Sequence, residues 1–299
     1  ERLTLHNFDF VYFQLSATRL ALKNTFLLGA LAATAGGLLA LVSTPGFDTN
    51  LFVNGISSSE YSALRDSLDV PLFNRAIQGT YPPGSTIKPF MAMAGLLSGL
   101  VNPQSTVRDP GWYSLPGDSR KYRDWILRVT GTGHAYTVNM KMAIAESCDV
   151  YFYDLARRLT IDRMHDYLLP FGFGERTGID TTNERTGVLP STQWKRAAMA
   201  QSWYPGETIS AGIGQGYMLA SPLQLAVATS VMASRGQRRV PRLVMAVDGE
   251  PLPAPQLAPL EAPPEYWDAV FDGMREVVHG QRGTAKALAK GILYEMAGK

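Results

Sequence analysis

A rigid turn joined directly to an apolar helix constrains this chain more than any other stretch of its sequence. Tyr81-Pro82-Pro83-Gly84 predicts a turn, because proline fixes its own φ angle and glycine accepts conformations that other residues avoid. Ser85 to Leu100 follows with the spacing of an apolar helix, and its only charged residue is Lys88. The sequence therefore predicts a helix whose first turn carries Ser85 and Lys88.

The rest of the pattern predicts mostly helices, with strands near both ends of the chain. Apolar periodicity indicates helices at Ser59–Ser67, Val138–Leu159, Ile161–Leu169, Ser221–Ala233 and Glu265–Val278. Short apolar runs indicate strands at Leu38–Val42, Arg239–Val247 and Ile292–Met296. Residues 101–134 are rich in Pro, Gly, Asp and Arg and predict an irregular insertion. This order favours an α+β fold in which helices pack on an antiparallel sheet.

The composition is that of a globular protein and excludes several classes. Of the 299 residues, 45% are hydrophobic and 18% are charged, which excludes wholesale disorder. A net charge of +2 gives no basic field that would indicate a nucleic-acid partner. Cys148 is the only cysteine, so no intramolecular disulfide can form.

The N-terminal part of the chain has no clear period up to residue 35, and an orderly pattern begins at Gly36. Asn24 to Phe47 is uncharged and long enough for a membrane span. Gly36-Gly37 and the turn Ser43-Thr44-Pro45-Gly46 interrupt this stretch, which favours a buried strand at Leu38–Val42 over a transmembrane helix. The first residues do not show the pattern of a signal peptide.

A serine and a lysine three residues apart at a helix start can act as a nucleophile and its base. Ser85 and Lys88 lie on one helix face, so the hydroxyl and the amine can meet across one turn. A serine hydroxyl reacts when a base takes its proton, and burial favours the neutral, basic form of a lysine. The helix N-terminus also turns a backbone N–H toward a developing oxyanion. Ser-x-x-Lys also occurs by chance, so the pair alone does not establish catalysis.

Two further polar elements lie later in the chain. Ser147-Cys148-Asp149 places a hydroxyl and a carboxylate two positions apart within the expected helix Val138–Leu159. These side chains can lean over Ser85 from a neighbouring helix. They can equally form a polar kink, because serine and aspartate are mediocre helix formers. The other element is Lys299, directly after a glycine.

Together these elements resemble the three motifs of serine penicillin-interacting enzymes: Ser85-x-x-Lys88, Ser147-x-Asp149 and Gly298-Lys299. Longer stretches resemble class B penicillin-binding proteins, and within that class the penicillin-binding protein 2 branch: Leu38–Asp48, Asn50–Ile56, Tyr81–Pro89, Tyr122–Trp125 and Ile213–Tyr217. The resemblance covers about residues 36–299. It implies a penicillin-binding/β-lactamase-like transpeptidase domain there, with an antiparallel sheet flanked by helices and an all-helical subdomain. Residues 1–35 would be the remnant of an N-terminal pedestal.

The resemblance also implies a role for each motif residue. Ser85 would attack the carbonyl between the two D-alanines of a peptidoglycan stem peptide, and Lys88 would take its proton. Ser147 would relay a proton to the leaving amine, and Asp149 would keep Lys88 or the substrate amide oriented. Lys299 would tune Ser147 and attract the substrate carboxylate. Acyl chemistry of this kind requires no cofactor.

The chain departs from the family pattern in two places. Asp149 stands where most members have asparagine, and a carboxylate there would favour a protonated Lys88. The elongation branch carries aspartate at this place, so we interpret Asp149 as a mark of that branch. The residues expected after Lys299, most of the pedestal and a membrane anchor are not in the sequence. We therefore expect that the full-length protein has segments, including an anchor, that this chain lacks.

The function that the resemblance implies is a D,D-transpeptidase that crosslinks peptidoglycan during lateral elongation of the cell wall and that β-lactams acylate. Its substrates would be stem peptides. Its partners would be a RodA-like glycan polymerase and an MreC-like scaffold, at the periplasmic face of the bacterial inner membrane. A catalytically limited β-lactam sensor on the same fold is the alternative. A class A or class D β-lactamase fits poorly, because nothing matches the deacylating surroundings of those enzymes.

Four residues in and next to the insertion are candidate metal ligands: Asp109, Asp124, His134 and Cys148. A thiolate, an imidazole and two carboxylates suit tetrahedral zinc. Their spacings follow no short zinc motif, so a buried cysteine among ordinary polar residues is the alternative. The resemblance favours the metal, because elongation-branch members carry zinc at matching positions. A structural zinc would tie residues 101–134 to the base of the Ser147 helix.

Overall fold

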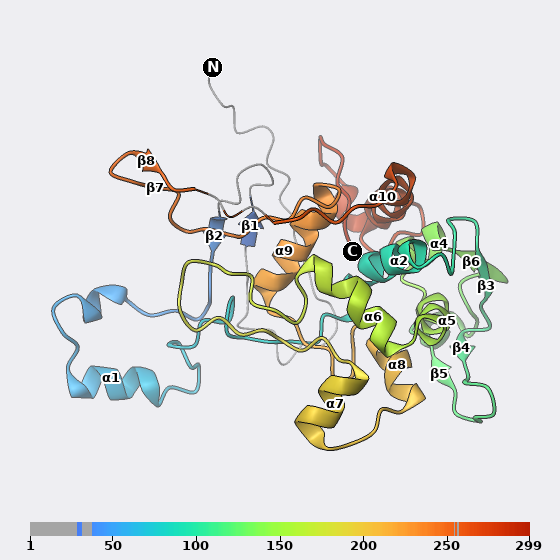
Figure 1. Cartoon of the computed structure of the whole chain (residues 1–299), viewed down its shortest axis with the longest axis horizontal. Helices are drawn as coiled ribbons and strands as arrows, with labels where there is room; N and C mark the ends of the chain where they lie inside the picture. The colour runs from blue at the N-terminus through green and yellow to red at the C-terminus, as the bar shows by residue number, and fades with distance from the viewer. Residues whose placement is uncertain (1–28, 32–37, 254, 256) are drawn as a thin grey trace.

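The computed structural model of the chain describes residues 29–31, 38–253, 255 and 257–299. Figure 1 shows the arrangement of its elements. The α-helices are α1 Ser58–Arg65, α2 Lys88–Leu97, α3 Leu127–Thr130, α4 Met140–Ala145, α5 Asp149–Leu159, α6 Ile161–Leu168, α7 Thr192–Met199, α8 Pro205–Ala211, α9 Pro222–Ala233 and α10 Pro264–His279. The strands are β1 Gly29–Leu31, β2 Leu38–Leu41, β3 Thr106–Arg108, β4 Trp112–Tyr113, β5 Tyr122–Arg123, β6 Thr137–Asn139, β7 Ala246–Val247 and β8 Glu250–Pro251. Short 3-10 helices lie at Thr49–Phe52, Gly84–Ile87, Leu169–Phe171 and Lys286–Ala289.

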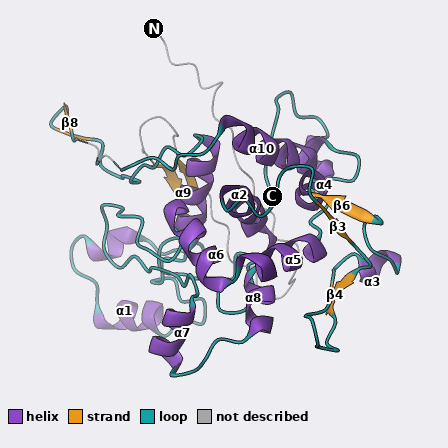
Figure 2. Cartoon of the chain, turned by 45° about the vertical axis from the view of Figure 1, so that its right-hand side comes forward, coloured by secondary structure: helices purple, strands orange, loops and turns teal. Residues whose placement is uncertain are grey.

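Helix α2 lies at the centre of the molecule and is surrounded by other helices (Figure 2). It contacts α4, α5, α6 and α10, and every residue from Lys88 to Leu96 is buried. Phe90 packs edge-on against Phe171 and Phe173, with ring centres 5.1 and 5.2 Å apart. Pro89 occupies the first turn, where a helix needs no backbone N–H. The apolar run after the Pro-Pro-Gly turn is therefore the core helix of the domain.

The strands pair as four two-stranded antiparallel sheets in the described part of the chain: β1 with β2, β3 with β6, β4 with β5, and β7 with β8. The predicted fold class, helices with antiparallel strands, is confirmed. Strand β2 matches the strand predicted at Leu38–Val42, inside the uncharged stretch Asn24–Phe47. Among the residues that the structure describes, no helix has the length and apolar character needed to cross a membrane. The pedestal remnant proposed at residues 1–35 lies outside the described residues, apart from β1.

The helix predicted at Ser85–Leu100 is α2, and Ser85 itself lies in the 3-10 turn Gly84–Ile87 that leads into it. Four other predicted helices are confirmed with small shifts of their ends, as α1, α6, α9 and α10. Helices α7 and α8 were not predicted. Helix α7 starts at a capping serine, Ser191, whose side chain accepts the N–H of Trp194, and α8 starts at Pro205. The irregular insertion at residues 101–134 holds only β3, β4, β5 and the one-turn helix α3.

The single helix predicted at Val138–Leu159 is wrong, because this segment holds a strand and two helices. Strand β6 ends at Asn139, whose side chain accepts the N–H of Met142 at 3.0 Å and so starts α4. Ser147 then adopts a left-handed conformation with φ of +60°, and Cys148 is extended. The second motif is therefore the break between α4 and α5, not a kink within one helix.

Of the two other predicted strands, one is confirmed only in part and one is wrong. Arg239–Val247 is a strand only at its end, β7, because the carboxylate of Asp180 accepts two backbone N–H groups of this segment at 2.7 and 2.9 Å. Ile292–Met296 forms no strand. Its last backbone N–H donates to His279 Nε2 of α10 at 3.0 Å. In both segments side chains accept backbone N–H groups, and the first segment pairs with β2 only locally, where the Arg242 carbonyl accepts the N–H of Leu38 at 3.1 Å.

Candidate active site

The turn that carries Ser85 packs against the loop at residues 213–217. Gly84 donates its backbone N–H to the carbonyl of Gly214 at 2.8 Å. Gly214 has a φ of +71°, and a Cβ atom on it would lie 2.3 Å from the Gly84 carbonyl oxygen. Only glycine allows this approach. The loop thus fixes the backbone just before Ser85, which is itself partly buried.

Lys88 lies one turn after Ser85 and is completely buried. Its Nζ donates to Asp149 Oδ1 at 2.6 Å, to the Ser147 carbonyl at 2.8 Å and to Ser147 Oγ at 3.1 Å. The Phe152 ring centre is 5.5 Å from Nζ. A buried amine needs hydrogen-bond partners, and these acceptors provide them. The first and second motifs are therefore joined through one amine.

Lys299 lies close to this group. Its Nζ donates to the carbonyl of Ile144 in α4 at 2.8 Å. Burial lowers the pKa of the Lys299 amine well below its usual range, and the nearby Lys88 lowers it further, whereas Asp149 acts in the opposite direction. The structure thus brings Lys88, Ser147, Asp149 and Lys299 together, with Ser85 one turn from Lys88.

Two contacts at this site were not predicted from the sequence. Trp125 Nε1 donates to the Ser147 carbonyl at 3.1 Å, and Gly214 packs on the Ser85 turn as described above. Trp125 lies within the stretch Tyr122–Trp125 that carried the family resemblance. Its contact had no signal in the sequence, because 22 residues separate the two partners.

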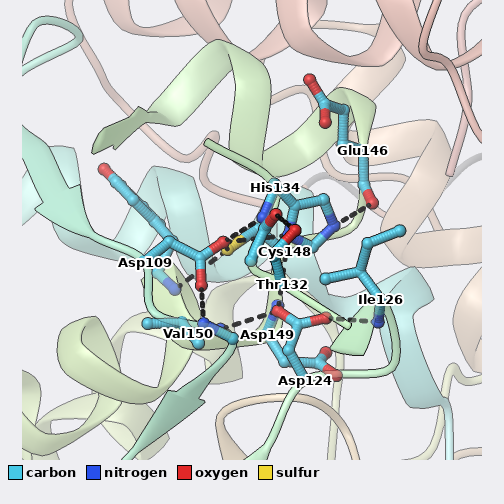
Figure 3. A network of polar contacts seen from close by, with 12 residues as sticks. Asp109, Asp124, Ile126, Thr132, His134, Glu146, Cys148, Asp149 and Val150 are labelled. Atoms are coloured by element: carbon cyan, nitrogen blue, oxygen red, sulfur yellow. Dashed lines mark hydrogen bonds and ion pairs between the residues drawn. The ribbon is translucent and has the colours of Figure 1, made fainter. Parts of the chain in front are cut away.

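The four candidate metal ligands converge on one point (Figure 3). Asp109, Asp124, His134 and Cys148 are all buried, and one donor atom from each lies within 4.8 Å of the others. His134 Nδ1 is 3.0 Å from Asp109 Oδ2 and 3.6 Å from Asp124 Oδ2. Cys148 Sγ is 3.5 Å from Asp109 Oδ2. Ligands of one tetrahedral zinc ion are about 3.3–3.8 Å apart. The Asp124–His134 and Asp109–Cys148 distances lie in this range, and His134 and Asp109 lie at hydrogen-bond distance, so small shifts would let the four groups share an ion.

Outer contacts orient these donors. The second ring nitrogen of His134, Nε2, is 3.1 Å from the Glu146 carbonyl. This contact assigns the ring proton to Nε2 and leaves the lone pair of Nδ1 available to a metal ion. Asp109 Oδ1 accepts the N–H of Gly111 at 2.8 Å. Asp124 Oδ2 accepts the N–H of Asp149 at 2.6 Å, so this carboxylate also caps α5.

The electrostatics of the cluster favour a cation. Burial raises the pKa of the Asp124 carboxyl, and the nearby Asp149 raises it further. Burial also raises the pKa of the Cys148 thiol well above its usual value, and Asp124 and Asp109 add to the effect. A cation among these groups would offset the mutual repulsion of their anionic forms. Both the donor set and its charge therefore fit zinc.

Comparison with known proteins shows the family of this domain. Residues 28–299 match the family described as the penicillin binding protein transpeptidase domain. The chain belongs to this family. It is 45% identical over 275 residues to the peptidoglycan D,D-transpeptidase MrdA of Acinetobacter baumannii, and 41% identical over 286 residues to MrdA of Escherichia coli K12. These alignments cover 90% and 92% of the chain but 40% and 44% of the relatives, so the chain spans less than half of their length.

Solved structures of relatives have the same fold. Pseudomonas aeruginosa PBP2, in complex with WCK 5153, superposes with a TM-score of 0.83 and 46% identity, covering 90% of this chain and 60% of that one. Helicobacter pylori PBP2, in complex with MreC, gives a TM-score of 0.78 and 33% identity, covering 89% and 47%. The resemblance to the penicillin-binding protein 2 branch is confirmed.

Proposed function

We propose that this chain is the catalytic domain of a serine acyltransferase, a peptidoglycan D,D-transpeptidase of cell-wall elongation. The observation that carries the proposal is the buried Lys88 amine, which lies one turn from Ser85 and bonds Ser147 Oγ at 3.1 Å. An amine that bonds one hydroxyl and lies one turn from a second could take a proton from the second and pass it to the first. Similarity to curated D,D-transpeptidases supports the same reaction. Residues 36–299 would form this domain, and residues 1–35 the remnant of its pedestal.

In acylation, Ser85 Oγ attacks the carbonyl carbon between the two D-alanines of a stem peptide. The neutral Lys88 amine takes the hydroxyl proton as the C–O bond forms. The Ser147 hydroxyl gives its proton to the departing nitrogen and regains one from Lys88, which leaves the amine neutral again. The C–N bond breaks, D-alanine leaves and an ester on Ser85 remains. Asp149, 2.6 Å from Lys88 Nζ, would balance the transient ammonium.

In deacylation, the amine of a neighbouring stem peptide attacks this ester. Its proton passes by way of Ser147 and Lys88 back to Ser85, and the new amide is the crosslink. Water in place of the amine would give D-Ala-D-Ala carboxypeptidase activity. A β-lactam would acylate Ser85 by the same first step and inhibit the enzyme for as long as its ester persists.

Lys299 would bind the carboxylate at the end of the donor peptide. Burial lowers the pKa of the Lys299 amine, so an incoming carboxylate would supply the opposite charge that favours its ammonium form. That ammonium would support Ser147 as a proton donor, because a nearby cation favours the anionic form of a hydroxyl.

A structural zinc ion would be held by Asp109, Asp124, His134 and Cys148. The convergence of four buried donors of the right chemistry supports it. The ion would tie the insertion at residues 101–134 to the start of α5, where Asp124 already caps the helix. It would supply no acyl chemistry, so the reaction itself needs no cofactor.

The partners and location follow from the substrate and from the relatives. Peptidoglycan lies outside the cytoplasm, so the full-length enzyme would work at the periplasmic face of the inner membrane, held by an anchor. The PBP2 of H. pylori has been solved with MreC, which supports an MreC-like scaffold as a partner here. A RodA-like glycan polymerase would supply the strands to be crosslinked.

Turnover of a stem-peptide thioester by the purified full-length protein tests the proposed function. We expect repeated turnover in the presence of an acceptor amine, and none from the Ser85→Ala variant. A single acylation event per molecule would refute the transpeptidase proposal and favour the alternative, a β-lactam sensor on the same fold.

A further inference from the structure

Ser147 has a backbone conformation that needs support from its neighbours. Its φ is +60°, a region that residues other than glycine rarely adopt. Its own N–H reaches the carbonyl of Ile144 only at 3.4 Å. Its carbonyl is held more firmly, because Lys88 Nζ donates to it at 2.8 Å and Trp125 Nε1 at 3.1 Å. These two donors fix the direction of the peptide group that follows Ser147.

The two groups that donate to the Ser147 carbonyl, Lys88 Nζ and Trp125 Nε1, differ in their other contacts. Lys88 also bonds Ser147 Oγ and Asp149, and it must serve Ser85 during the proposed reaction. Its hydrogen bond to the Ser147 carbonyl would therefore change through the reaction cycle. The indole N–H of Trp125 carries no charge and takes no part in proton transfer, so its hydrogen bond to the Ser147 carbonyl would stay the same through the cycle.

Trp125 is itself held in place by the insertion. The preceding residue, Asp124, accepts the backbone N–H groups of Asp149 and Val150 at 2.6 and 3.2 Å, which ties this part of the insertion to the start of α5 (Figure 3). The Trp125 ring packs edge-on against His134, with ring centres 5.8 Å apart. The indole thus contacts both His134 of the insertion and Ser147 of the second motif. The residue is 42% exposed.

We propose that Trp125 is a positioning residue for acylation, which acts by holding the carbonyl of Ser147 through its indole N–H. The hydrogen bond keeps the left-handed Ser147 in place, so that its hydroxyl stays within reach of Lys88 while that amine handles the proton of Ser85. This inference rests on the proposed acyl chemistry, and it assigns to Trp125 a role apart from packing.

The test compares variants of the full-length protein in their acylation by a fluorogenic penicillin. Trp125→Phe keeps an aromatic ring beside His134 but removes the N–H. Trp112→Phe is the matched control, because Trp112 lies in β4 of the same insertion and its ring stacks under Lys121, 4.1 Å away. Stopped-flow measurements separate the acylation rate constant from the dissociation constant of the initial complex. We expect Trp125→Phe to lower the rate constant about tenfold with the dissociation constant unchanged, which is the effect of losing one hydrogen bond. Trp112→Phe should stay within about twofold of the wild type.

A second substitution keeps the result interpretable if Trp125→Phe perturbs packing. 3-Benzothienylalanine at position 125 retains the shape of the indole and replaces its N–H with sulfur. The same loss of rate at an unchanged melting temperature and metal content would support the proposal. A wild-type rate with this residue would overturn it and leave Trp125 a packing residue. If the wild-type protein itself is not acylated, the proposed function fails, and this result is distinct from failure of the Trp125 proposal.

Discussion

Replacement of Gly214 by alanine tests how tightly the 213–217 loop controls the Ser85 turn. The new Cβ would lie 2.3 Å from the carbonyl oxygen and 2.7 Å from the nitrogen of Gly84. Ordinary contacts of a Cβ atom begin near 3.4 Å, so one of the two segments must move by about 1 Å. A misplacement of that size at a reacting group slows an enzyme by about 100-fold. The left-handed backbone and the forced contact together should lower the free energy of unfolding by about 2–5 kcal/mol.

Gly216→Ala is the matched control for this change. Gly216 lies in the same loop and has nearly the same φ, +70°, but its Cβ would meet only the Cβ of Ser210, at 3.3 Å. This variant therefore carries the backbone strain, about 1–2 kcal/mol, without the contact with Gly84. Both variants would be compared by urea denaturation and by the rate of acylation with a fluorogenic penicillin. Equal acylation rates in Gly214→Ala and Gly216→Ala would refute the coupling of the loop to Ser85.

Three further predictions concern the core, the base and the metal. Phe90→Ala should lower the free energy of unfolding by about 3–5 kcal/mol, because the ring fills the space between Phe171 and Phe173; a loss below about 1 kcal/mol in urea denaturation would contradict this packing. Lys88→Ala should slow acylation by about 10²–10⁴-fold with the circular-dichroism spectrum retained, and a wild-type rate would exclude Lys88 as the base. Elemental analysis should find about one zinc per chain, and its removal by a chelator should lower the melting temperature, whereas a zinc content near zero in untreated protein would refute the site.

Local signals in the sequence were enough to predict the first motif and the core helix. The spacing of Ser85 and Lys88 places both on one turn whatever surrounds them. The helix after Gly84 is apolar on nearly every side, so it is expected to be buried in any fold. The four candidate metal ligands were also named from the sequence, although their convergence depends on how the insertion folds back onto the start of α5, which their spacing does not encode.

The errors came from places where tertiary contacts decide the backbone. The apolar pattern of Val138–Leu159 continues through the second motif, but the chain turns there because Lys88 and Trp125 hold the carbonyl of a left-handed Ser147. The strand predicted at Arg239–Val247 is shortened to its end, because the carboxylate of Asp180, distant in sequence, accepts two of its backbone N–H groups. Contacts between residues so far apart in the sequence produce no periodic pattern around either residue, so the sequence does not predict them.

The most direct test of the central claim is the site of acylation. Full-length protein would be incubated with a penicillin, digested and mapped by mass spectrometry, with Ser85→Ala as the control. We expect one adduct per chain, on the peptide that contains Ser85, and no adduct on the variant. An adduct on any other residue, or an equal adduct on Ser85→Ala, would contradict the assignment of Ser85 as the nucleophile.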